Sequence, residues 1–238
     1  MTARSKIALT GLAAVGAFAC WVRPRLLRWG ATDAEVAGPF PGAELVPGGQ
    51  RAATMAATIN APPEQVWPWL AQMGWQRGGW YSWDRLDNAG HPSATEVRPE
   101  WQHLAVGDRL QAWSPRGLLA PWEVAALEPN WFLGLHKLTD LHGRALDPQR
   151  PRPPAYLEGL WGFQLNQAPD GCTRLVISGH QAIRPRWLER IVFDGSNVIV
   201  VWVMQARMLS VLKRNINRAA NPSAPPAPQP VTAAVSRR

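Results

Sequence analysis

The sequence predicts an α+β protein in which a curved antiparallel sheet wraps around a long C-terminal helix. Between residues 109 and 183, five short segments of strand character are separated by turn signals and not by helices. Such spacing is typical of an antiparallel meander. From about Ser196 to Arg218, apolar residues recur at the period of an α-helix, and basic residues occupy its last turns. Together these two patterns indicate one sheet and one long helix.

The first element, Ile7–Val22, has no charged residue over 16 positions and is flanked by basic residues on both sides. Three interpretations remain open: an uncleaved single-pass membrane anchor, a cleaved signal peptide that ends at Ala17–Ala19, and a buried core helix. We favour an anchor over residues 1–29, because the arginines that follow the cleavage point would hinder export. The side chains expected in the membrane are Ile7, Leu9, Leu12, Val15, Phe18, Trp21 and Val22.

The next segments lead from the anchor into the domain. Residues 30–50 are rich in glycine and proline, so an extended connector is expected. Small and β-branched residues predict a strand at Arg51–Asn60, and an amphipathic helix follows that ends at Gly74. After Gly78-Gly79, the sequence predicts a glycine-hinged loop and a short helix around Trp83–Asn88.

The meander comes next and is interrupted once, by a proline-rich excursion at residues 138–156 that is expected to be a flap. Residues 219–238 are rich in proline and alanine, which predicts a disordered tail. This order of elements is that of a helix-grip fold, in which the sheet and the last helix leave an apolar cavity between them. The predicted strands are Arg109–Trp113, Trp122–Leu127, Trp131–Lys137, Leu160–Gln167 and Thr173–Ile183.

Composition and charge exclude several classes of protein. The chain has 238 residues, of which 46% are hydrophobic, so it is not wholly disordered, and its two cysteines exclude a disulfide framework. Residues 1–28 carry a charge of +5 and residues 184–238 carry +7, whereas residues 29–183 hold 11 basic and 15 acidic side chains. A nucleic-acid-binding domain needs its cations on the folded surface, so we expect no nucleic-acid partner. The basic ends favour an anionic membrane surface and a cytoplasmic location for the folded domain.

The stretch APPEQVWPWLAQMGWQRGGWYSWD at residues 61–84 resembles a signature of the START/polyketide-cyclase superfamily, also called SRPBCC. Further matches follow in order between residues 29 and 218, among them Pro99-Glu100-Trp101-Gln102 and Trp161-Gly162-Phe163. The resemblance implies a START-like helix-grip domain at residues 51–218, in a membrane-anchored branch, with a cavity for hydrophobic ligands. Because the chemistry of the superfamily ranges from lipid transport to cyclase and aromatase activity, the resemblance carries over no catalytic residue.

The aromatic loop is the best candidate for a binding site. Two glycines allow a sharp turn that presents Trp80, Tyr81 and Trp83 to a cavity mouth, with the Tyr81 hydroxyl as a polar handle. The alternative, equally weighted, is that these rings cap the core. Arg77 is a second candidate, although pairing with Asp84 or Asp87 is favoured. Four more residues are candidates to line the cavity, with plain core packing favoured for each singly: Trp131, Trp161, Trp202 and Met204.

No other motif carries recognisable chemistry. The histidines have no metal-ligand spacing, Cys172 has no neighbouring base in the sequence, and no phosphate or dinucleotide fingerprint is present. We therefore expect no metal, no cofactor and no catalytic constellation. The function expected is binding of a small hydrophobic or amphipathic ligand by a membrane-tethered monomer. Two alternatives stay open: a cyclase- or aromatase-like enzyme, and an interaction protein whose cavity its own side chains fill.

Overall fold

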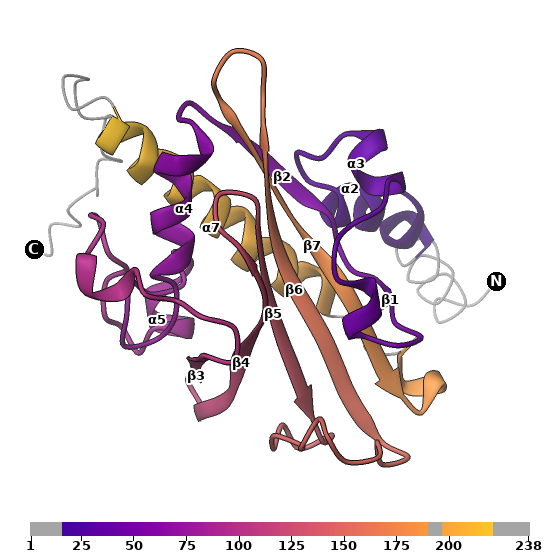
Figure 1. Ribbon diagram of the computed structural model, residues 1–238. Helices are drawn as coiled ribbons and strands as arrows, with labels where there is room; N and C mark the ends of the chain where they lie inside the picture. The colour runs from indigo at the N-terminus through magenta and orange to yellow at the C-terminus, as the bar shows by residue number, and fades with distance from the viewer. Residues whose placement is uncertain (1–15, 190–196, 221–238) are drawn as a thin grey trace, which may run out of the picture.

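The computed structural model describes residues 16–189 and 197–220, which form an α+β domain (Figure 1). Seven antiparallel strands build one sheet, and the long helix α7 (Asn197–Ala220) crosses one face of it (Figure 1). These features confirm the predicted fold class, antiparallel sheet and C-terminal helix. Of the expected tail, residues 219 and 220 belong to α7 and the rest lies outside the described residues.

The strand order is β1-β7-β6-β5-β4-β3, and β2 also pairs with β7. The strands β6 and β7 pair along their whole length, from Tyr156↔Arg184 to Gln167↔Thr173. This pairing makes β6 longer than its apolar sequence pattern predicts. The seven strands are β1 (Gln50–Arg51), β2 (Met55–Ile59), β3 (Arg109–Ser114), β4 (Gly117–Glu128), β5 (Phe132–Thr139), β6 (Tyr156–Gln167) and β7 (Thr173–Arg184).

One face of the sheet, here called the inner face, packs against α7 and α4 (Pro63–Ala71). Strand alternation places Leu133 and Leu135 of β5 on this face with Phe163 of β6, and all three are fully buried. Trp69 of α4 and Leu212 of α7 belong to the same apolar cluster. The helices are held by this shared core, because burial of apolar surface contributes roughly 25 cal/mol per Å².

The opposite, outer face is covered by the segment predicted to be an extended connector. It contains two short helices, α3 (Asp33–Ala37) and η2 (Ala43–Leu45), and its Phe40 packs with Phe132 of β5. Arg51 of β1 lies over the Phe40 ring at 4.7 Å and donates to the Gly38 carbonyl at 3.2 Å. Residues 30–50 are therefore part of the folded body.

A capping box starts α3. The Thr32 hydroxyl accepts a hydrogen bond from the Glu35 N–H, and the Glu35 carboxylate accepts one from the Thr32 N–H. This reciprocal pair satisfies two helix-end donors, which a plain coil would leave to water. The capping box stabilises this short helix although the glycine and proline content of the segment favours coil.

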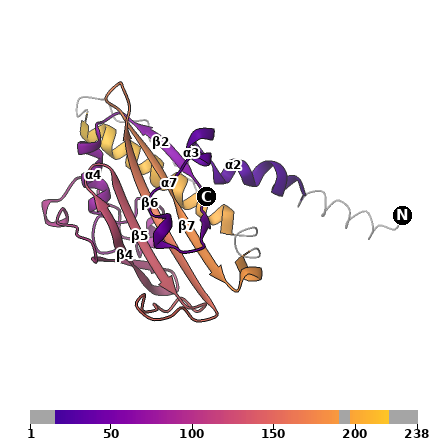
Figure 2. The same cartoon turned by 45° about the vertical axis from the view of Figure 1, so that its right-hand side comes forward.

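The N-terminal helix runs directly into the sheet edge. Residues 16–27 are helical, with a π-helical turn, η1 (Phe18–Val22), followed by α2 (Arg23–Leu27). The carbonyls of Leu27 and Trp29 then accept hydrogen bonds from the N–H groups of Thr54 and Ala56, at 2.9 and 3.1 Å. Figure 2 shows α2 projecting away from the sheet on the side of β2.

The predicted anchor falls only partly within the structure. Ile7, Leu9, Leu12 and Val15 lie outside the described residues, whereas Phe18, Trp21 and Val22 belong to η1. The exposed fractions of Trp21 and Val22 are 68% and 45%. Among residues 16–189 and 197–220, we find no helix with the length and apolar character of a membrane span.

The proline-rich excursion after β5 is tied to the sheet. Its Arg152 donates to the Glu158 carboxylate of β6 at 2.6 Å, and the same oxygen lies 3.1 Å from His136 Nε2 of β5. Glu158 is buried on the outer face, so these two partners compensate its charge. The predicted flap is therefore held to β6 by the ion pair between Arg152 and Glu158.

Candidate functional site

An aromatic cluster occupies the inner face where β4, β5 and β6 run side by side. Its centre is Trp161, whose ring lies 5.6 Å from Trp80, 5.5 Å from Trp122 and 4.8 Å from Phe163, measured between ring centroids. The Trp80 and Trp161 rings are stacked, with 29° between their planes. Two of the predicted site residues, Trp80 and Trp161, thus lie in direct contact.

The aromatic loop is fastened to α7. The Ser82 hydroxyl donates to the Met204 carbonyl at 3.1 Å, and the Trp83 indole N–H donates to the Val203 carbonyl at 3.3 Å. The structure thereby brings Trp83 and Met204, both predicted site residues, to the same junction of loop and helix. Gly79 allows this path, because its φ of +76° is in the left-handed region and a Cβ there would lie 2.6 Å from Ser93 Oγ.

The Tyr81 side chain is fully buried, and its hydroxyl has a protein partner. The Gln72 side-chain amide donates to this hydroxyl at 2.6 Å, while the amide oxygen of Gln72 accepts from the Arg98 N–H at 3.0 Å. Burial raises the pKa of the Tyr81 hydroxyl, so Tyr81 stays neutral at physiological pH. The polar handle predicted for a ligand is thus engaged by Gln72 at the C-terminal end of α4.

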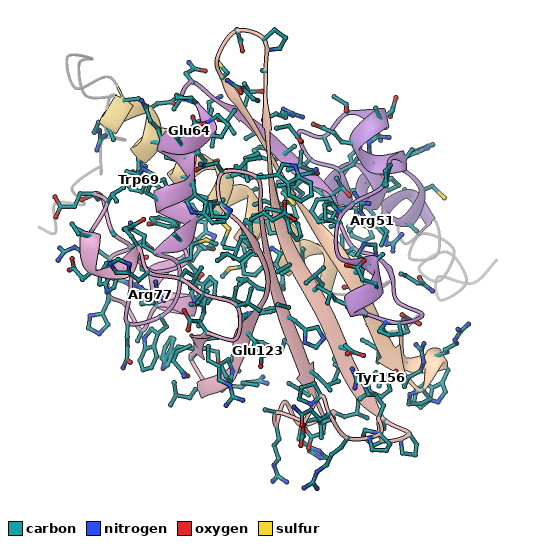
Figure 3. All side chains as sticks on the ribbon, viewed as in Figure 1. Arg51, Glu64, Trp69, Arg77, Glu123 and Tyr156 are labelled. Carbon is teal, nitrogen blue, oxygen red and sulfur yellow. The ribbon has the colours of Figure 1, made fainter. Side chains whose placement is uncertain are left out.

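Arg77 also binds protein groups. Its guanidinium donates to the carbonyls of Ala71 and Trp101 at 3.0 and 2.7 Å, and neither Asp84 nor Asp87 is the partner. Burial lowers the pKa of this guanidinium. Figure 3 places Arg77 among the loops beside α5 (Asp84–Asp87), to the left of the central strands. Through these two hydrogen bonds, Arg77 joins the end of α4 to the segment that contains Trp101.

Lys137 of β5 is a residue of the inner face that the sequence analysis did not single out. The register pairs Lys137 with Gly159 and Leu135 with Trp161, so Lys137 shares a face with the aromatic cluster. Its ammonium lies 4.2 Å from the centre of the Trp122 ring. Burial lowers the pKa of the Lys137 ammonium to about 8. The alternation Leu133, Leu135, Lys137 was the available signal, because it places a lysine on a buried face.

Lys137 has no anionic partner in the structure. Within residues 16–189 and 197–220, no carboxylate forms an ion pair with it and no acceptor takes a hydrogen bond from it. Among the paired residues of the seven strands, it is the single charged side chain on the inner face. A cation on an apolar face normally has a counter-ion.

Two indole nitrogens also lack partners in the described part of the chain, those of Trp161 and Trp202. Trp161 belongs to β6 and Trp202 to α7, and both rings pack against the main apolar cluster. Buried polar groups are paired in most proteins, so these two N–H groups are available to a ligand or to water.

Gly159 leaves space on the inner face beside Lys137. A Cβ built on Gly159 would meet a single atom within 4 Å, the His180 carbonyl oxygen at 3.8 Å. Lys137, Gly159 and Gln181, which follow one another across β5, β6 and β7, are all half-buried, whereas Leu135 and Phe163 are fully buried. The inner face is thus divided into a packed part and an accessible part.

Trp131 lies on the other side of the sheet. It lines a groove of about 510 Å³ on the outer face, between the N-terminal segment and the turn that joins β4 to β5. The structure therefore separates Trp131 from the other predicted site residues. The groove is also lined by Pro39, Phe40, Pro41, Glu44 and Phe132.

Two histidines of the sheet, His136 and His180, have structural partners. His180 Nε2 lies 3.3 Å from the Phe40 carbonyl oxygen, and His136 lies beside Glu158 as described above. Cys172 is in the turn between β6 and β7, where its N–H donates to Asp170. No group of three histidine, cysteine or carboxylate side chains within the two described ranges is arranged to hold a metal ion.

Comparison with known proteins gives a likeness of structure alone. No family model matches the chain, and no curated protein matches its sequence. A crystal structure of a Mesorhizobium loti protein is 23% identical, covers 69% of this chain and 97% of its own, and has a TM-score of 0.39. A solution structure of an Arthrobacter aurescens protein is 13% identical, with coverages of 78% and 94% and a TM-score of 0.40. Function therefore has to be inferred from the residues of this chain.

Proposed function

We propose that this chain is a membrane-tethered binding protein of the START-like, helix-grip type, which holds a small hydrophobic or amphipathic molecule between its sheet and α7. The observation that carries the proposal is the accessible part of the inner face: within the described residues, Lys137 has no anionic partner and the Trp161 indole N–H has no hydrogen-bond partner, beside the open position of Gly159. Polar groups on an otherwise apolar face are the usual composition of a ligand site.

The energetic basis of binding is burial of apolar surface. The rings of Trp80, Trp122 and Trp161 offer broad apolar faces, and a ligand gains roughly 25 cal/mol per Å² of apolar surface removed from water. The few unpartnered polar atoms orient the ligand, because each would otherwise remain unsatisfied. Exchange of the ligand requires motion at the junction of the aromatic loop and α7.

Sequestration or transport is favoured over a cyclase-like reaction. The residues that would move protons in such an enzyme are Tyr81, Arg77 and His180, and each is engaged by a protein group. A general acid or base must reach the reacting atom of the substrate. These contacts keep all three occupied with the fold itself.

The tether is the N-terminal segment. The exposed Trp21 and Val22 of η1 offer apolar surface, and Arg25 adds positive charge beside it, whereas Arg28 pairs with Asp33. We place the folded domain on the cytoplasmic side of the membrane, facing the anionic leaflet. Labelling of Cys172 in a Cys20→Ser variant by an impermeant thiol reagent, in whole and in lysed cells, tests this side. Labelling in whole cells would contradict it.

The test of binding is native mass spectrometry of the purified full chain, combined with extraction and analysis of any small molecule. Gly159→Leu fills the open position, and Gly16→Leu adds the same side chain where a Cβ would meet nothing within 4 Å. We expect an apolar molecule to co-purify with the wild type and with Gly16→Leu, and to be lost from Gly159→Leu. Equal amounts in all three folded proteins would contradict a site at this position.

A further inference from the structure

We propose that the ligand of the inner face is an acid, an amphiphile whose anionic head group pairs with Lys137. This inference rests on the proposed function, since it names the class of molecule that the same site takes. It also assigns the head-group end of the ligand to the stretch of β5 and β6 around Lys137 and Gly159.

The first argument is the unbalanced charge. Lys137 lies on a face formed otherwise by apolar and uncharged residues, and the close partner that the described residues offer it is the Trp122 ring. A cation–π contact offsets only part of the free-energy cost of removing an ammonium from water without a counter-ion. The protein thus leaves most of this cost uncompensated. An anionic ligand supplies the missing counter-ion.

The second argument is the chemistry of the neighbouring groups. Trp161 is two residues after Gly159 in β6 and therefore on the same face, so it is the diagonal neighbour of Lys137. Within the described residues, its indole N–H is a buried donor without a partner. A lysine ammonium and an indole N–H can only donate. They therefore select a head group made of acceptors, such as a carboxylate or a phosphate.

The third argument is space. Any side chain at Gly159 would occupy the position directly across from Lys137, and the backbone there is not in the left-handed region that requires glycine. A β-strand in the centre of a sheet gains from a side chain at such a position. The missing side chain leaves room for a head group beside the ammonium.

The experiment measures binding of three fluorescent probes that share one polyene chain: the fatty acid, the corresponding alcohol and the phosphate monoester. We expect the full chain to bind at least one of the acids about tenfold or more tightly than the alcohol. Lys137→Met should bring that affinity down to the level of the alcohol, and should leave the affinity for the alcohol unchanged. Lys213→Met is the matched control, because Lys213 is exposed on α7 and its loss removes the same charge.

A second readout locates the contact. The chain has three lysines, Lys6, Lys137 and Lys213, so acylation by a lysine reagent can be followed site by site by mass spectrometry. The bound acid should slow acylation of Lys137 and leave that of Lys213 unchanged. If Lys137→Met does not fold, Lys137→Gln and this protection measurement in the wild type keep the test decisive.

The two proposals fail in different ways. Equal affinity of the wild type for acids and alcohol, with no protection of Lys137, would overturn the acid assignment and leave the binding proposal standing. Failure of all three probes to bind, together with the absence of a co-purifying apolar molecule, would overturn both.

Discussion

Arg174 and Glu35 form a two-point ion pair, with Nε 2.7 Å from Oε1 and Nη2 2.9 Å from Oε2. Arg174 projects from the outer face of β7, and Glu35 belongs to α3, 139 positions earlier in the chain. The same guanidinium donates to the Gly30 carbonyl at 2.6 Å. Hydrogen bonding to Arg174 lowers the pKa of Glu35 to about 2. This pair fastens the N-terminal segment to the sheet.

Glu35→Gln should therefore destabilise the protein by about 1 kcal/mol at pH 7, because a two-point charged hydrogen bond is replaced by a neutral one. Since the pKa of Glu35 is lower in the folded state, its contribution is present above pH 4.5 and is lost as the pH falls towards 2. Urea unfolding of both proteins at pH 7 and pH 2 checks this expectation. A difference in stability that persists at pH 2 would contradict it.

Asp87 has the opposite pH dependence. Burial and the neighbouring Asp84 raise the pKa of Asp87 to about 7. Its contribution to stability is therefore complete below pH 3.8 and is lost as the pH rises from there through 7. Asp87→Asn should raise the melting temperature at pH 8.5 and change it little at pH 3. Glu64→Gln, which removes an exposed carboxylate of α4, is the control measured in parallel. Equal effects of Asp87→Asn at both pH values would exclude this carboxyl as the source.

Lys137→Met should stabilise the ligand-free protein while it impairs binding of acids. The pKa of Lys137 is lowered from 10.5 to about 8, so its charge opposes folding below pH 8 and the penalty disappears as the lysine deprotonates. We expect the variant to gain on the order of 1 to 3 kcal/mol at pH 7, and less at pH 9.5. Urea unfolding at both pH values measures the gain. A less stable Lys137→Met protein would mean that the lysine serves the fold.

The aromatic loop offers a graded series of substitutions. Tyr81→Phe removes the hydroxyl that accepts from Gln72 and should cost about 1 kcal/mol, whereas Tyr81→Ala empties a fully buried site and should cost about 3 to 5 kcal/mol. Trp83→Ala should cost less than Tyr81→Ala, because Trp83 is 44% exposed. Chemical denaturation ranks the three variants. If Tyr81→Ala kept wild-type stability but no longer bound a ligand, Tyr81 would be a ligand-binding residue and not part of the core.

The fold class was predictable because it depends on patterns along the chain. Turn signals and alternation gave the antiparallel strands, and apolar periodicity gave α7. The helix α3 was missed although its capping box, Thr32 to Glu35, is visible in the sequence. Composition led to the wrong expectation there, since glycine and proline around a short helix resemble a linker.

The site was harder to predict because its contacts join distant segments. The partners of Arg77 are the backbone carbonyls of Ala71 and Trp101. Every residue has a backbone carbonyl, so the sequence does not indicate which ones accept a hydrogen bond. Trp80 meets Trp161 only because β6 lies in the middle of the sheet. Lys137, in contrast, was within reach of the sequence, since it follows two apolar residues of the inner face at the strand period.

The backbone hydrogen bonds from Thr54 and Ala56 to Leu27 and Trp29 join the N-terminal helix directly to the domain, without a flexible linker between them. A flexible linker would let a tethered domain rotate freely, but here the last turn of α2 is joined to the edge of β2 within two residues. The helix and the sheet consequently move as one rigid unit. If α2 lies on a membrane as proposed, the angle of α2 to the surface sets the orientation of the whole sheet.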